Sequence, residues 1–276
     1  MNGRRSRTAA WATAAAALCV AGLVGLGACS RTPAGHPALA LPPTSGAFDY
    51  QLGGAYPPAA GVTVVSRDST DEPAKGVYSI CYVNGFQTQP GVAWPSELYL
   101  HTADGAPLVD PGWPDEHLLD ISTAAKREAE ARMQGQTIRR CKTAGFRAVE
   151  FDNLDSYTRS KGALSEADAI AFAKLLVSAA HDEGLAAAQK NTDQLGARGK
   201  TEIGFDFAVA EECDRFDECG DYTKVYGAHV LDVEYPDDLR GTFAEVCGRK
   251  GTPALTILRD RDLVPRGADG YVYRSC

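Results

Sequence analysis

The chain has 276 residues, of which 44% are apolar, and a formal net charge of −8 at pH 7. This is enough apolar material for one large domain or two small ones. An acidic chain does not favour nucleic acid as a partner, because phosphate binding needs clustered Lys and Arg; it suits a cationic substrate, and equally any acidic exported protein.

The first 28 residues differ in composition from the rest of the chain. Arg4, Arg5 and Arg7 precede an Ala-, Val- and Leu-rich run that ends in LGAC at residues 26–29. This pattern is typical of a secretory signal peptide, and the run is too short and Ala-rich to favour a permanent membrane-spanning helix. Removal of residues 1–28 takes away three arginines and no acidic residue, so the net charge falls from −8 to −11.

The LGAC ending resembles a bacterial lipobox, which predicts lipidation of Cys29 after cleavage. The alternative is an ordinary signal peptide cut nearby, with Cys29 incidental. Residues 29–46 are rich in Pro, Ala and Gly and are predicted to form a flexible tether. We therefore expect an exported protein held to the outer face of the bacterial cytoplasmic membrane only by its lipid anchor, with residues 47–276 as the folded domain.

Six cysteines remain beyond the signal peptide and Cys29. An even number in an exported protein predicts disulfides, although six cysteines allow fifteen pairings. Zinc is the alternative, but the chain has no C-x-x-C pair and no close Cys/His cluster, so no metal is expected. We predict one disulfide across a short loop, one at the C-terminus and one by elimination: Cys213–Cys219, Cys247–Cys276 and Cys81–Cys141.

From Phe48 onward, eight short apolar runs each end in polar residues. Runs of this length, rich in Val and Ile and with little alternation, are typical of strands buried on both faces. They occupy residues 48–54, 61–68, 76–84, 146–153, 185–191, 205–213, 229–235 and 253–260.

Helical segments separate several of these runs. The clearest helix covers residues 165–183 and begins with an approximate capping box of Ser165 and Asp168. Three further helices are predicted over residues 122–144, 215–226 and 238–248. The helices that would join the first three strands look shortened or missing.

Eight strands with intervening helices in about 230 residues predict a single (β/α)8 TIM-type barrel with some helices shortened or missing. The alternative is an open, doubly wound sheet. No G-x-G-x-x-G follows the first strand, however, and the chain has no Gly-rich P-loop.

In such a barrel, catalytic residues lie at the C-terminal ends of the strands. There this sequence has Asp152, Asn153, Asp155, Lys190, Asn191, Glu211, Glu212, Glu234 and Asp260. A buried parallel strand has no structural need for an acid at its end, although any single one could be a loop or salt-bridge residue. Paired carboxylates suggest glycoside hydrolysis, in which one carboxyl protonates the leaving oxygen and the other attacks or activates water.

Other chemistries have weaker support. There is no G-x-S-x-G motif for a serine hydrolase and no H-E-x-x-H motif for a zinc enzyme. None of the five histidines stands at a predicted strand end beside an obvious partner. A calcium-binding EF-hand is excluded as well, because Leu154 occupies the position two after Asp152, where that loop needs an acid or an amide.

The ordered set of motifs resembles glycoside hydrolase family 114, the endo-α-1,4-polygalactosaminidases. The resemblance runs from Phe48 to Cys276, and the combination is specific although each motif alone is weak. The matching stretches are ICY at 80–82, HLLDI at 117–121, AGFRAVEFDNLDSY at 144–157, AHDEGLAAAQKN at 180–191, FDFAVAEEC at 205–213, DECGDY at 217–222, VEY at 233–235 and the terminal Cys276.

The resemblance implies a barrel that cleaves α-1,4-linked galactosamine polymers without a cofactor, with Asp152 as nucleophile and Glu211 as general acid/base. A retaining outcome would need their carboxyl groups only about 5–5.5 Å apart. The expected partner is a cationic amino-sugar polysaccharide, whose amines could pair with spare carboxylates, and the protein is expected to be a monomer. Residues expected to line the sugar site are Tyr82, Asn153, Asp155, Asn191 and Glu234.

One loop departs from the family pattern. Many members carry a G-x-x-E-x-x-R-like stretch after the CY motif, whereas here VNGFQTQPGVAWPSE lacks the Arg and has no Glu before Glu97. We therefore expect the sugar subsite built by this loop to differ. Two alternatives to a lipid-anchored polygalactosaminidase stay open: a hydrolase for another amino-sugar polymer, and a non-catalytic polysaccharide-binding lipoprotein on the same barrel.

Overall fold

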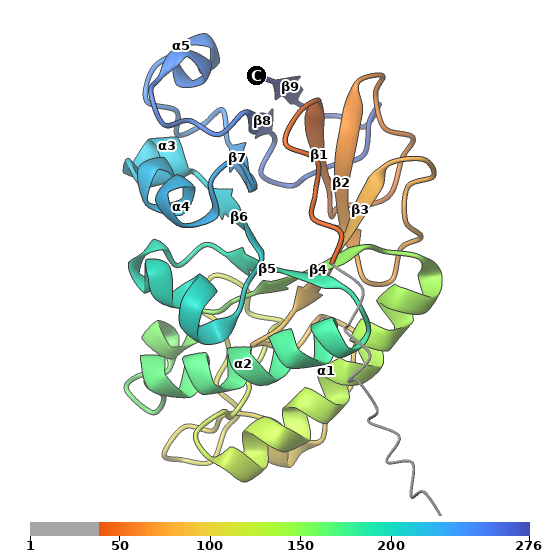
Figure 1. Ribbon diagram of the computed structural model, residues 1–276. Helices are drawn as coiled ribbons and strands as arrows, with labels where there is room; N and C mark the ends of the chain where they lie inside the picture. The colour runs from red at the N-terminus through yellow and green to blue at the C-terminus, as the bar shows by residue number, and fades with distance from the viewer. Residues whose placement is uncertain (1–38) are drawn as a thin grey trace, which may run out of the picture. The chain divides into compact units, whose positions relative to one another are not determined.

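A computed structural model of the protein describes residues 39–276, so the predicted signal peptide and Cys29 lie outside the described residues. Within that range one sheet runs in the order β1 to β9; β1 to β8 are parallel, and β9 is antiparallel to β8. The sheet curls into a nearly closed barrel (Figure 1), which confirms the predicted TIM-type fold. The strands are β1 (Ala47–Gln51), β2 (Val62–Asp68), β3 (Tyr78–Asn84), β4 (Ala148–Asp152), β5 (Ala186–Lys190), β6 (Phe207–Glu211), β7 (Val230–Glu234), β8 (Leu255–Arg259) and β9 (Tyr273–Ser275).

Strands β1 to β8 are buried on both faces, as their apolar runs predict. Alternate residues such as Phe48, Ile80 and Phe207 fill the barrel interior. The intervening residues, such as Val149 and Phe151 of β4, pack outward in a second apolar cluster that includes residues of the helices. This alternation decides which side chains at a strand end face the barrel mouth.

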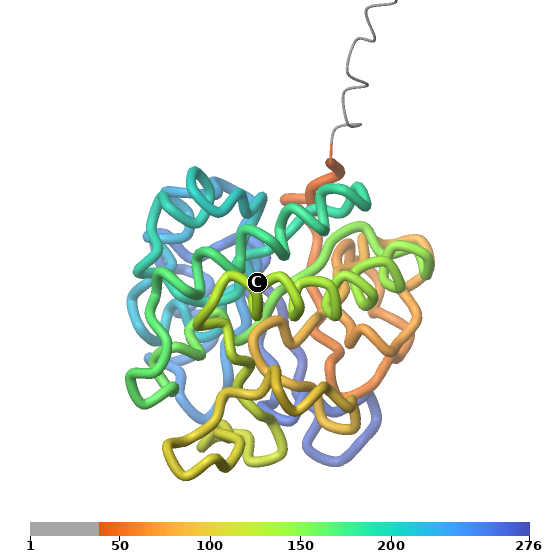
Figure 2. Tube along the Cα trace, turned by 90° about the horizontal axis from the view of Figure 1, so that it is seen from below, coloured from red at the N-terminus to blue at the C-terminus, as the bar shows by residue number. Residues whose placement is uncertain are grey.

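Two long helices and three short ones accompany the strands. The α-helices are α1 (Ala124–Ala144), α2 (Glu166–Asp182), α3 (Cys213–Phe216), α4 (Cys219–Tyr226) and α5 (Phe243–Gly248). The short turns of other helix types are η1 (Ser96–Leu98), η2 (Ser156–Arg159), η3 (Asp193–Leu195) and η4 (Gly199–Ile203). Helices α1 and α2 lie side by side (Figures 1 and 2), and α2 begins with the predicted capping box of Ser165 and Asp168. The links between β1, β2 and β3 carry no helix, as expected.

Two weaker helix predictions and one strand need correction. The helix expected over residues 215–226 is broken into α3 and α4 at Asp217, whose φ of 65° is left-handed. The helix expected from residue 238 starts only at Phe243, because Gly241 has a φ of 94° and the capping box is formed by Thr242 with Glu245. Strand β9 was not expected, since three residues are too few to show a periodic pattern.

All three predicted disulfides are formed. Cys81–Cys141 joins β3 to α1, Cys213–Cys219 joins the starts of α3 and α4, and Cys247–Cys276 ties the last residue to α5.

Side chains join the two edges of the barrel, where β8 and β9 meet β1. The fully buried Arg259 donates a hydrogen bond to the backbone carbonyl of Tyr50, and its Nη1 lies 3.3 Å from Asp49 Oδ1. The Tyr273 hydroxyl donates to the carbonyl of Phe48 at 2.9 Å. A buried ion pair and side-chain hydrogen bonds therefore hold the mouth of the barrel together at this seam.

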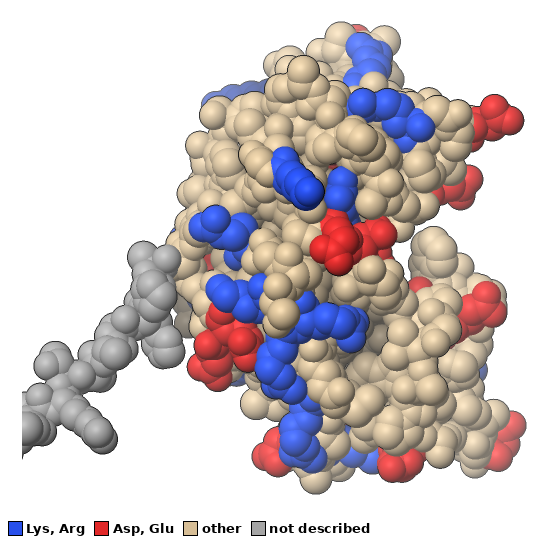
Figure 3. All heavy atoms as spheres, turned by 90° about the vertical axis from the view of Figure 1, so that its right-hand side faces the viewer, with Lys and Arg blue, Asp and Glu red and all other residues tan. Residues whose placement is uncertain are grey.

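The exposed charges are unevenly distributed. Figure 3 shows Lys and Arg side chains in a band over one face, and α1 contributes exposed basic residues such as Arg132, Arg139 and Lys142. Net charge alone therefore does not locate a surface that would bind a cation. No helix among residues 39–276 is long and apolar enough to cross a membrane.

Candidate active site

The C-terminal ends of β4, β5 and β6 place two carboxylates around one buried ammonium. Lys190, the last residue of β5, is only 2% exposed. Its Nζ lies 3.4 Å from Oδ2 of Asp152 and 3.1 Å from Oε2 of Glu211. The two acids predicted to be catalytic thus share a counter-ion, and these two oxygens cannot be farther apart than the sum of 3.4 Å and 3.1 Å.

The local backbone explains why these side chains stay at the barrel mouth. Each of the three is the last residue of its strand and has the same parity as the inward-facing residues before it. The next residue in each case is left-handed: Asn153 has a φ of 63°, Asn191 of 47° and Glu212 of 59°. Asn tolerates this conformation better than most residues, so the chain can turn away directly after the strand.

Asp152 is held by two hydrogen bonds in addition to its contact with Lys190. The Tyr82 hydroxyl donates to Oδ2 at 2.8 Å, and the backbone N–H of Asn153 donates to Oδ1 at 2.8 Å. Burial, and then the charge of Asp152, raise the pKa of Tyr82 well above its ordinary value. Tyr82 therefore remains a protonated donor at every working pH.

Glu211 is held by Asn191 and Tyr235. The Asn191 amide donates to Oε2 of Glu211 at 3.2 Å, and the Glu211 backbone N–H donates back to Asn191 Oδ1 at 2.8 Å. The Tyr235 hydroxyl donates to the other carboxylate oxygen. Burial by itself would raise the pKa of Glu211, but the ammonium of Lys190 and the hydrogen bond from Tyr235 outweigh it and hold that pKa below its ordinary value.

A second, fully buried layer lies beneath the pair. Glu150 accepts hydrogen bonds from the Tyr50 hydroxyl at 2.6 Å and from Ser66 Oγ at 2.8 Å. Lys190 Nζ donates to the same Tyr50 oxygen at 3.1 Å and lies 3.5 Å from Glu150 Oε1. Burial raises the pKa of Glu150. The sequence held a signal for this layer, because Glu150 and Asp152 stand two apart on one strand and a buried Lys must be paired.

Two of the acids expected in the sugar site have other contacts. Asp155 Oδ2 is paired with Arg159 at 2.8 Å, a cation that it shares with Asp110. Glu234 lies on the face of β7 opposite to the inward-facing Tyr235, and its Oε1 accepts from the backbone N–H of Asp214 at 2.7 Å. The structure therefore brings Tyr82, Asn153 and Asn191 to the catalytic pair, but not the carboxylates of Asp155 and Glu234.

An acid that sequence reasoning missed lies close to Asp152. Asn153 donates to Asn84 Oδ1 at 2.8 Å, and Asn84 donates in turn to Glu116 Oε2 at 2.7 Å. Burial, followed by the charges of Asp152 and Asp110, raises the pKa of Glu116, and within residues 39–276 no Lys or Arg forms an ion pair with it. Glu116 belongs to the long irregular segment between β3 and α1, where no periodic pattern marks it.

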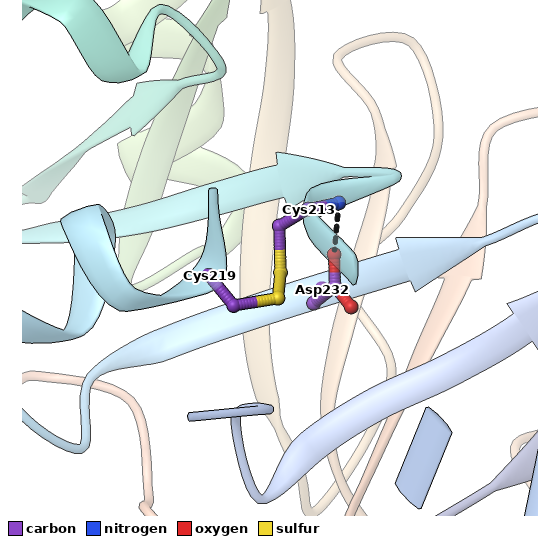
Figure 4. Close-up of side chains that lie close together, drawn as sticks. All are labelled: Cys213, Cys219 and Asp232. Carbon is purple, nitrogen blue, oxygen red and sulfur yellow. Dashed lines mark hydrogen bonds between the residues drawn. A yellow bond between two sulfur atoms is a disulfide. The ribbon is translucent and has the colours of Figure 1, made fainter. Parts of the chain in front are cut away.

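The outer face of β7 carries a disulfide beside a buried acid (Figure 4). The backbone N–H of Cys213 donates to Oδ1 of Asp232 at 3.3 Å, and Cys219 completes the trio. The two sulfurs are bonded to each other, so they have no thiolate to offer a metal. Burial, and then the neighbouring Glu234, raise the pKa of Asp232 well above its ordinary value, which suits a protonated, structural carboxyl behind β6 and β7.

The comparisons with known proteins bear on the family and the fold. The family model described as glycoside-hydrolase family GH114 matches residues 30–276. Among solved structures, the chain is similar to Aspergillus fumigatus Ega3 in complex with galactosamine: 18% identity and a TM-score of 0.69, over 88% of this chain and 100% of that one. It is also similar to the glycoside hydrolase domain of PelA from Pseudomonas aeruginosa, with 15% identity and a TM-score of 0.55 over 82% and 98%. No curated protein sequence matches.

The Glu234 carboxyl gives a prediction for stability against pH. Burial raises its pKa from 4.5 to about 7, so between those values the folded protein keeps a proton that the unfolded chain releases. Stability therefore falls as the pH rises from about 4.5 to 7. The Glu234→Gln variant has no carboxyl there and should not lose stability in this way. The difference in free energy of unfolding between the variant and wild type should therefore change by about 2 kcal/mol in favour of the variant as the pH rises from 4.5 to 7.

Urea denaturation of both proteins at a series of pH values measures this difference. Asp182→Asn, an exposed acid at the end of α2, serves as the control and should track wild type. A constant offset between Glu234→Gln and wild type, with no change between pH 4.5 and 7, would show that the buried carboxyl does not titrate in this way.

Proposed function

The chain belongs to glycoside-hydrolase family GH114, and on that premise we propose that this glycoside hydrolase cleaves an α-1,4-linked, deacetylated galactosamine polymer with two carboxylates. The observation that carries the mechanism is the pairing of Asp152 and Glu211 around Lys190 at the barrel mouth. Galactosamine is the sugar bound in the Ega3 structure, which supports this substrate class.

In this mechanism Asp152 attacks the anomeric carbon while Glu211 gives a proton to the leaving glycosidic oxygen. Water then breaks the resulting ester, and Glu211 removes the proton from that water. Retaining enzymes hold their carboxyls about 5–5.5 Å apart and inverting enzymes about 6.5–9.5 Å apart. The shared contact with Lys190 limits the spacing of two of the oxygens, which favours the retaining course.

The electrostatics fit two successive roles for Glu211. In the free protein Lys190 favours its ionised form, which is the base needed in the second step. A sugar bound in the barrel mouth would exclude water from Glu211 and bury its carboxyl further. Burial is the largest influence that raises the pKa of Glu211. Substrate binding therefore moves Glu211 toward the protonated form that the first step needs.

Glu116 is the carboxylate that we propose for the amine of the substrate. It is half-buried, lies on the Asn84–Asn153 chain that leads to Asp152 and has no cationic partner among residues 39–276. Asp155, which the sequence suggested for this role, is already paired with Arg159. An ammonium group beside Glu116 would form a charge-assisted hydrogen bond with a carboxylate that, among residues 39–276, accepts from the Asn84 amide and has Arg159 as the cation that lowers its pKa.

The location of the enzyme is a further part of the proposal. The LGAC motif supports export and lipidation of Cys29, and the Pro- and Ala-rich residues that follow support a tether from the outer face of the cytoplasmic membrane. We propose that the enzyme acts there as a monomer.

The catalytic assignment predicts the effect of two isosteric variants. Asp152→Asn and Glu211→Gln should each lower the rate of oligosaccharide release from purified polygalactosamine by at least about a thousandfold, because each removes a group that reacts. The exposed acids Asp182 and Glu128 provide matched controls as Asp182→Asn and Glu128→Gln, which should behave as wild type. A wild-type protein that releases no oligosaccharide contradicts the substrate, and variants that remain active contradict the site.

The role of Glu116 predicts a change in substrate affinity. Glu116→Gln should raise KM for deacetylated galactosamine oligomers about tenfold with little change in kcat, and should weaken the dependence of KM on salt. Glu97→Gln, an exposed acid in the same segment, is the control and should leave KM unchanged. Equal KM values for the two variants would remove Glu116 from substrate recognition.

A further inference from the structure

Lys190 is a buried cation that the two-carboxylate mechanism does not itself require. Charged or titratable groups face its ammonium from five places around the barrel. They are Tyr50 on β1, Tyr82 on β3, Glu150 and Asp152 on β4, Glu211 on β6 and Tyr235 directly after β7. One nearly buried positive charge therefore stands among three carboxylates, of which Glu150 is fully buried and Asp152 and Glu211 are partly exposed.

The charge state of this lysine follows from its partners. Burial alone would lower the pKa of Lys190, but Asp152, Glu211 and Glu150 together raise it well above its ordinary value. The side chain therefore stays an ammonium throughout the pH range in which the Glu211 carboxyl changes charge.

Contacts with Tyr50 and Tyr82 fix the position of the Lys190 ammonium. Its Nζ donates to the Tyr50 hydroxyl at 3.1 Å, and that hydroxyl donates to Glu150 at 2.6 Å. Nζ also lies 5.5 Å from the ring centre of Tyr50 and 5.7 Å from that of Tyr82. A lysine stem is normally flexible, so these contacts are what keep the ammonium of β5 between two acids from the strands on either side of it.

We propose that Lys190 is a positioning residue of the hydrolytic site, seated on Tyr50 and Glu150 so that its ammonium holds the carboxyl groups of Asp152 and Glu211 at a fixed spacing. This inference rests on the proposed function. Without the ammonium, one fully buried carboxylate and two partly exposed ones would repel one another. The two reacting groups would then lose their fixed spacing, and Glu211 would lose the cation that lowers its pKa.

A purely structural role for Lys190 predicts a different pH dependence of activity in a Lys190 variant. A lysine that only fills space could be replaced at a cost in stability and yield, but the pH dependence of the surviving activity would not move. A lysine whose charge lowers the pKa of Glu211 must move it, because loss of a nearby cation raises the pKa of an acid.

The test compares Lys190→Met with Lys174→Met, which replaces an exposed lysine of α2. For each protein, kcat/KM on polygalactosamine is measured against pH, and the Glu211 carboxyl is titrated by ¹³C NMR with Glu211→Gln to assign its signal. In Lys190→Met, kcat should fall about a hundredfold. The limb of the pH profile that is set by Glu211, and the Glu211 titration itself, should move upward by about one to three pH units. Lys174→Met should match wild type.

A fall in kcat with an unmoved pH profile and an unmoved Glu211 titration would overturn the proposal. If Lys190→Met does not fold, Tyr50→Phe provides the test of the proposal. This variant removes the hydroxyl that accepts a hydrogen bond from the Lys190 ammonium, and it changes no charged residue. Its profile should shift in the same direction by a smaller amount, and no shift would overturn the proposal. If wild type does not cleave the polymer, the proposed function fails, while the NMR titration still decides the role of Lys190.

Discussion

The site depends on one buried ammonium that must balance several carboxylates. Lys190 can be buried only because Asp152, Glu211 and Glu150 surround it, and these acids can stand so close together only because Lys190 lies among them. The tyrosines serve the same balance: Tyr82 donates to Asp152 and Tyr235 to Glu211, so each carboxylate has a neutral donor as well as the shared cation.

The barrel supplies the geometry that this balance needs. Parallel strands end at the same rim, and residues of the same parity point inward, so the last residues of β4, β5 and β6 converge without any long loop. Left-handed residues directly after each of these strands turn the chain away and leave the mouth open. A second buried cation, Arg259, joins the β8 edge to β1 in a comparable way, by pairing with Asp49 and bonding the Tyr50 carbonyl.

The sequence predicted what depends on local pattern. Asp152 and Glu211 stand at the ends of apolar runs, and those runs are long enough to show the barrel strands. The role of Lys190 could not be derived in the same way, because its partners come from other strands. Glu116 lies in an irregular segment without periodicity, so no pattern marks it. Glu234 points out of the barrel because alternate residues of β7 face opposite sides and the next residue, Tyr235, faces inward; the sequence alone does not show which of the two does so. Residues placed by long-range packing were thus the ones that were missed.

The central claim is that Asp152 lies close enough to Glu211 to attack the sugar directly, so that the reaction retains the anomeric configuration. The anomeric configuration of the first product tests this most directly. Proton NMR can follow a galactosamine oligomer from the first minutes of cleavage, before the released sugar equilibrates in water. Formation of the α-anomer first is the result expected from nucleophilic attack by Asp152 followed by water. Formation of the β-anomer first would contradict it, because water would then have attacked in a single step between more widely separated carboxyls.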